Sequence, residues 1–70
     1  MRNRTYIALV EKDFTLNQKV ESYFEQMNIK IIHYYKNLNI LQLEANYLLD
    51  ATKLDFIYYL EEDKSFQNLN

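Results

Sequence analysis

The residues of this chain that could do chemistry are few, and the most conspicuous are acids near its C-terminal end. Glu61, Glu62 and Asp63 follow one another directly after an apolar run. Paired carboxylates can act as general acid and base, but neighbours at the end of a strand point in different directions and imply no pocket. Carboxylates placed there can instead accept hydrogen bonds from helix N-termini of another protein. These acids therefore favour a binding role.

The other reactive side chains form no catalytic pattern. His33 is the only histidine, and it lies inside a strand-like apolar run. A lone histidine without cysteines or paired acids at ligand spacing is far more often structural. Ser22 and Ser65 have no evident base beside them, and no phosphate-binding loop or metal motif is present. The sequence therefore predicts a non-catalytic chain with no cofactor, no metal and no small-molecule substrate.

Composition places the chain among small globular domains. Its 70 residues suffice for one domain, and 49% of them are hydrophobic, including seven Tyr and four Phe. A domain of this size buries only about 60% of its unfolded surface, so we expect marginal stability. The net charge is −2 with scattered basic residues, which argues against nucleic acid as a partner. No apolar run approaches the ~18 residues of a membrane span, and the lack of cysteine excludes disulfides.

The hydrophobic pattern predicts strands and helices in the order βαββαβ. Short runs rich in β-branched and aromatic residues indicate strands, and apolar residues at helical spacing indicate helices. Thr15 and Gln18 fit a capping box at the start of the first helix, and Asn46 can cap the second. The expected strands are Thr5–Glu11, Ile29–Tyr35, Ile40–Glu44 and Phe56–Glu61, and the expected helices run from Thr15 to Asn28 and from Asn46 to about Leu54.

Asparagine is expected at the turn positions because the chain contains no glycine and no proline. Among the other residues, asparagine tolerates positive φ best. We therefore expect Asn28 to end the first helix. Asn37 and Asn39 would form the short connection of an antiparallel hairpin.

The predicted fold is α+β and ferredoxin-like: a βαββαβ chain forming a four-stranded antiparallel sheet with two helices on one face. The other face would then be open. In Ile29–Tyr35 and Phe56–Leu60 both alternating sets of side chains contain large apolar groups, whereas a face meant only for water would alternate with polar residues. We expect the open face to dock on a partner. An unusually apolar small sheet and a homodimer interface are the alternatives.

From Thr5 to Leu69 the chain resembles the propeptides of subtilisin-like serine proteases, a family that includes propeptide-like inhibitors. Three segments in the family's order carry the resemblance, and the last is the most specific. Thr5–Glu11 is similar to the family's opening KYIVxFK strand, Ile29–Lys36 to its GKVxxxYKYI segment, and Ile57–Asp63 to its VxYVEED segment. The chain departs from the family where a glycine usually follows the first helix and where Asp-Pro usually precedes the last strand.

The resemblance implies a prodomain that acts as an intramolecular chaperone of a subtilisin-like protease and then inhibits it as a bound product would. The protease catalytic domain would be the partner. Its two parallel surface helices would receive the open face, with Ile57, Tyr59 and Tyr34 docking on them. Glu61 and Asp63 would cap the N-termini of those helices.

The resemblance also divides the chain into a domain of residues 1–65 and a tail of residues 66–70. The tail would lie in the active-site cleft, with Phe66 at the fourth position before the scissile bond. Leu69 would occupy the first position, or Asn70 would occupy it if the register moves by one residue. The expected cleft-binding residues are Phe66, Gln67, Asn68, Leu69 and Asn70.

The expected context is a secreted or cell-envelope bacterial precursor. Residues 1–4 contain no apolar stretch of a signal peptide, so an exported protein would carry this segment inside a longer chain. Two other functions stay open. One is a free-standing inhibitor of subtilisin-like proteases, and the other is a ferredoxin-like regulatory module that dimerises through its sheet.

Overall fold

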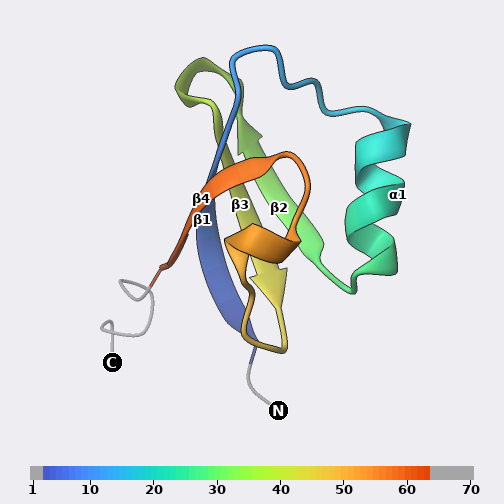
Figure 1. Ribbon diagram of the computed structural model, residues 1–70, viewed down its shortest axis with the longest axis vertical. Helices are drawn as coiled ribbons and strands as arrows, with labels where there is room; N and C mark the ends of the chain where they lie inside the picture. Colours follow the sequence, from blue (N-terminus) through green and yellow to red (C-terminus); the bar gives the residue numbers. More distant parts are fainter. Residues whose placement is uncertain (1–2, 64–70) are drawn as a thin grey trace.

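The computed structural model describes residues 3–63, which form a four-stranded antiparallel sheet and one α-helix (Figure 1). The sheet order is β2-β3-β1-β4, and each neighbouring pair is antiparallel. This confirms the predicted mixed α+β class and its antiparallel sheet. The elements are β1 (Arg4–Val10), α1 (Gln18–Gln26), β2 (Lys30–Tyr35), the 3₁₀ turn η1 (Lys36–Leu38), β3 (Ile40–Ala45), the 3₁₀ turn η2 (Ala51–Lys53) and β4 (Ile57–Glu62).

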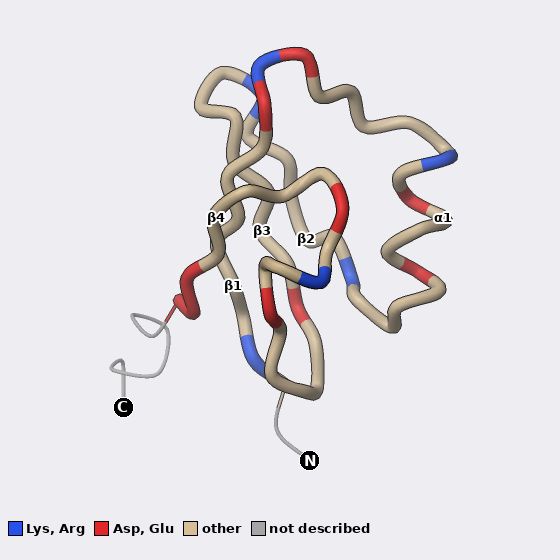
Figure 2. The backbone as a smooth tube through the Cα atoms, in the orientation of Figure 1, with Lys and Arg blue, Asp and Glu red and all other residues tan. Residues whose placement is uncertain are grey.

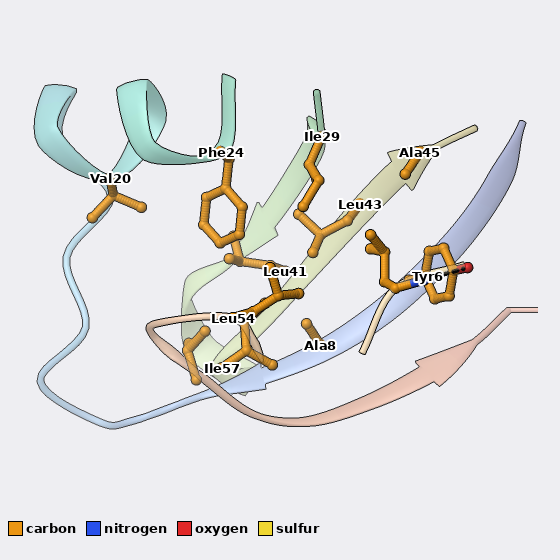
Figure 3. Packing of buried hydrophobic residues seen from close by; sticks show 12 residues of the cluster. Tyr6, Ala8, Val20, Phe24, Ile29, Leu41, Leu43, Ala45, Leu54 and Ile57 are labelled. Carbon is orange, nitrogen blue, oxygen red and sulfur yellow. Dashed lines mark hydrogen bonds between the residues drawn. The ribbon is translucent and has the colours of Figure 1, made fainter. Parts of the chain in front are cut away.

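The hydrophobic core lies between α1 and one face of the sheet, which we call the covered face. Phe24 of α1 is fully buried and points toward Leu41 of β3 (Figure 3). Fully burying a large aliphatic or aromatic side chain contributes about 1.5–3 kcal/mol, so this layer is the main source of stability. The buried cluster consists of Tyr6, Ala8, Val10, Val20, Phe24, Ile29, Leu41, Leu43, Ala45, Leu49, Leu54 and Ile57.

The N-terminus of α1 uses a different cap from the one expected. Asn17 is the N-cap, and its Oδ1 accepts a hydrogen bond from the backbone N–H of Val20 at 3.0 Å. The capping box of Thr15 and Gln18 is therefore wrong. Thr15 and Asn17 are both suitable N-cap residues by type, and the helix begins after Asn17.

No helix within residues 3–63 is long and apolar enough to cross a membrane.

Two asparagines take the positive-φ turns as predicted. Asn28 follows α1 with a φ of 60°, and the next N–H, that of Ile29, donates to the carbonyl of Phe24 at 2.9 Å. This bond closes the helix end as in a Schellman motif. Asn39 has a φ of 56°, whereas Asn37 lies within η1 and does not have positive φ.

The segment from Asn46 to Leu54 does not form the predicted second helix. Asp50 Oδ1 accepts hydrogen bonds from the Thr52 backbone N–H at 3.0 Å and from its hydroxyl at 2.7 Å, which starts η2 instead. Such local bonds compete with helical ones. The backbone N–H of Leu49 donates to the Tyr6 hydroxyl at 3.2 Å, so this group is satisfied without a helix. The described chain therefore has one helix where the ferredoxin-like prediction has two.

Both edge strands carry a bulge. In β4 the pairing with β1 passes from Ile57 to Tyr59 and skips Tyr58. In β2 the pairing with β3 likewise skips Ile32. One extra residue inverts the alternation of the side chains that follow it, so neither edge strand keeps a simple alternation along its whole length.

Candidate docking face

The face of the sheet opposite α1 is covered by no element of residues 3–63, and we call it the open face. Residues opposed across antiparallel strands lie on the same face, so the register sorts its side chains into three rows that cross the sheet from β2 to β4. The aromatic row is Tyr35, Ile40, Leu9 and Tyr59, the middle row is His33, Gln42, Ile7 and Glu61, and the charged row is Lys30, Glu44 and Thr5.

The aromatic row is apolar across the full width of the sheet. Ile40 and Leu9 are half-buried on the central strands, while Tyr35 and Tyr59 are 40% and 48% exposed on the edge strands. An antiparallel sheet face that only meets water alternates toward polar residues. A continuous exposed apolar row is instead typical of an interaction surface. Hydrogen bonding supports the row at one end, where the Tyr35 hydroxyl donates to Gln42 Oε1 at 3.4 Å.

The neighbouring acids Glu61 and Glu62 have different surroundings. Glu61 is exposed on the open face, and its Oε1 accepts a hydrogen bond from the Tyr59 hydroxyl at 3.2 Å. This bond to a carboxylate raises the pKa of Tyr59 above its usual 10.0. Glu62 opposes Tyr6 on the covered face and forms an ion pair with Arg4 at 3.1 Å. Only Glu61 of the two therefore presents its carboxylate beside the apolar row.

The end of β4 is held to the start of β1. The backbone N–H of Asp63 donates to the carbonyl of Thr5 at 2.7 Å. The chain therefore continues the line of the strand for one residue past Glu62. The acids at the end of β4 are the last residues that the structure describes (Figure 2).

The structure brings together only some of the residues that were expected to dock. Tyr59 lies on the open face, with Glu61 on the same strand. Ile57 is 7% exposed and belongs to the core. Tyr34 lies on the covered face, where its ring meets Phe14 edge-on at 5.3 Å and its hydroxyl donates to the Phe14 carbonyl at 3.3 Å.

The placement of Ile57 and Tyr34 on the open face is therefore wrong, and the two edge-strand bulges explain why. Simple alternation puts Ile57 on the same face as Tyr59, but the extra residue Tyr58 reverses it. The bulge at Ile32 acts in the same way on Tyr34. The expected tail residues, Phe66, Gln67, Asn68, Leu69 and Asn70, lie outside the described residues.

Sequence reasoning missed the centre of the open face. Ile7, Leu9 and Ile40 provide its apolar middle, and none of them was singled out. A signal was present in the first strand: Tyr6, Ala8 and Val10 alternate with residues that are also apolar. A central strand that is apolar on both sides contributes to two contact surfaces, of which the domain's own core uses one.

Neither a metal site within residues 3–63 nor a match to a known protein points to a function. Within residues 3–63, no group of three or more His, Cys, Asp or Glu side chains is placed to hold a metal ion. Comparisons with protein-family models, with curated proteins and with solved structures found no match to this chain. The open face and the sequence motifs are therefore the features of the chain that bear on its function.

Proposed function

We propose that this chain is a propeptide-type domain that binds the catalytic domain of a subtilisin-like serine protease, assists its folding and inhibits it. The observation that carries the proposal is the position of Glu61. Its carboxylate lies on the open face at the end of β4, directly beside the aromatic row. That is where a domain docking on a pair of helices would need a cap for a helix N-terminus.

We also propose that the fold is a ferredoxin-like one with a shortened second crossover. The strand order β2-β3-β1-β4 with antiparallel neighbours supports this arrangement. In this view η2 replaces the second helix, and the lone helix α1 covers the sheet together with the loop that contains Leu49 and Leu54.

The open face supplies affinity and Glu61 supplies orientation. Apolar area removed from water contributes about 25 cal/mol per Å², so packing the half-buried centre and the exposed Tyr35 and Tyr59 against a protease surface provides the main attraction. A carboxylate at a helix N-terminus adds about 0.3–2 kcal/mol of binding free energy, and this contribution depends on how the carboxylate is oriented. Charged groups at an interface fix register in this way.

The chaperone role follows from the same contact. A domain that binds the folded helices of a protease and not its unfolded chain stabilises the folded state by mass action. The domain itself is small and marginally stable, so binding would also stabilise the domain. Both effects draw on the same interface, so variants that weaken inhibition should also stabilise the folded protease less.

The test measures how strongly the 70-residue chain inhibits a panel of bacterial subtilisin-type proteases. Hydrolysis of a chromogenic peptide by each protease is the readout. We expect inhibition at micromolar concentration for the cognate type of enzyme. Glu61→Gln should raise the inhibition constant about fivefold, because a helix-capping interaction is worth about 1 kcal/mol. The matched control is Glu62→Gln, one residue away, which removes a partly exposed ion pair on the covered face and should leave the constant within about twofold.

Two outcomes would refute parts of the proposal. No inhibition of any member of the panel at about 100 μM, a concentration corresponding to weak binding, would reject the protease as partner. Equal effects of Glu61→Gln and Glu62→Gln would reject docking through the open face.

Deletion of residues 66–70 should weaken inhibition without unfolding the domain if the tail enters the cleft. The gene sequence beyond Asn70 distinguishes a prodomain from a free-standing inhibitor.

A further inference from the structure

The open face carries a pattern that is complementary to itself. In the middle row His33 stands at the β2 end and Glu61 at the β4 end. In the aromatic row Tyr35 and Tyr59 stand at the same two ends. Two stacked sheets related by a twofold axis parallel to their strands place β4 of one copy over β2 of the other. Each row then faces the same row of the other copy. We propose that two copies of this chain associate face to face in this way.

The pairing brings compatible groups together across the interface. The Glu61 carboxylate faces the imidazole of His33 of the second copy, which can donate an N–H to it. Tyr59 faces Tyr35 of the second copy, and Leu9 faces Ile40 in the centre. Because the interface is isologous, each of these pairs occurs twice.

Other ways of pairing two copies fit less well. A twofold axis across the strands would set the aromatic row against the charged row, so that Lys30 and Glu44 would lose water to apolar partners. Pairing through the sheet edges is disfavoured because both edge strands are bulged, at Ile32 and at Tyr58. Bulges are a common protection against edge-to-edge association. The face is therefore the surface through which a second copy fits.

The dimer should be weak. Four strands about 4.8 Å apart and six residues long give a face of only about 14 by 20 Å. Interfaces below about 1,200 Å² of total buried area belong to transient complexes. If the proposed function is right, the same face also meets the protease, so self-association and inhibition exclude each other. That consequence rests on the proposed function, whereas the dimer itself does not.

The experiment is sedimentation equilibrium of the 70-residue chain up to about 1 mM, a range suited to transient association. We expect a monomer–dimer equilibrium. His33→Glu and Glu61→Lys should each raise the dissociation constant about tenfold, because the first sets two carboxylates against one another and the second removes the acceptor of the His33 N–H. The double variant H33E/E61K places opposite charges at the same two positions and should return within about threefold of the original value. Glu25→Lys makes the same charge change on the exposed side of α1 and should have no effect.

A monomer at every concentration would overturn the proposal. So would a dimer whose dissociation constant does not change in either single variant, or a double variant that is weaker than both. Leu9→Asp, checked for folding by circular dichroism, places a charge in the centre of the face and should abolish the dimer. A dimer that persists in folded Leu9→Asp would exclude this face. Inhibition is measured separately at micromolar concentration, so a chain that dimerises at about 1 mM but inhibits no protease would refute the proposed function alone.

Discussion

Phe56 combines an unfavourable backbone with favourable ring contacts, and the two can be separated by mutation. Its φ is 75°, in the left-handed region, which costs a non-glycine residue about 1–2 kcal/mol. The ring packs edge-on against Tyr23 and Phe14, with centroids 5.3 and 6.2 Å apart, and the residue is 38% exposed. A fully buried Phe→Ala substitution costs about 3–5 kcal/mol, so this partly buried ring is worth about 2–3 kcal/mol.

The prediction compares Phe56→Ala with Phe56→Gly. Both lose the ring, but glycine also removes the backbone strain, against an entropic cost of about 0.5–1 kcal/mol. Phe56→Gly should therefore be about 0.5–1 kcal/mol more stable than Phe56→Ala. The control pair is Tyr58→Ala and Tyr58→Gly, at an exposed position of β4 where φ is not positive. There the glycine variant should be less stable than the alanine variant by a similar amount.

The assay is urea unfolding followed by circular dichroism, with sodium sulfate present to keep both variants folded at the start of the titration. The test depends on the sign of the difference in unfolding free energy between the glycine and alanine variants. This sign must be opposite at positions 56 and 58. If alanine is at least as stable as glycine at position 56, the strain assigned to Phe56 is refuted.

Two further predictions concern the helix cap and the second 3₁₀ turn. Asn17→Ala should lower the free energy of unfolding by about 1 kcal/mol, while Thr15→Ala should change it little; equal effects in urea unfolding would contradict the observed cap. Hydrogen bonds from Thr52 hold the pKa of Asp50 below its usual 3.8. The stabilisation linked to this carboxylate is therefore present above pH 3.8 and is lost as the pH falls through the lower folded-state value. Thr52→Val should raise the pKa of Asp50 toward 3.8 in an NMR titration, and an unchanged pKa would reject the role of the hydroxyl.

The sequence was sufficient for the strands because their signals are local. β-branched and aromatic runs predicted all four strands, and the absence of glycine predicted positive φ at Asn28 and Asn39. Local signals could not show that the predicted second helix is absent. This helix does not form because Asp50 bonds to Thr52 and because the hydroxyl of Tyr6, distant in sequence, accepts a backbone N–H of the loop.

The candidate site was only partly predictable for a related reason. The acids at the end of β4 stand out in the sequence, and Tyr59 lies beside Glu61 in the structure. The register of strand pairing and two bulges determine which other side chains share the open face with Tyr59 and Glu61. No local sequence pattern predicts either feature. Ile57 and Tyr34 were assigned to the wrong face for this reason, and the central residues of the face were missed.

The central claim is that the open face is the surface that meets a protease. It is tested most directly by methyl NMR of the chain bound to an active-site-blocked subtilisin-type protease. We expect the methyl signals of Ile7, Leu9 and Ile40 to shift, while those of Leu48, which is 72% exposed in the loop after β3, stay in place. Shifts confined to α1 and the loops, with the signals of the open face unchanged at saturation, would contradict the claim.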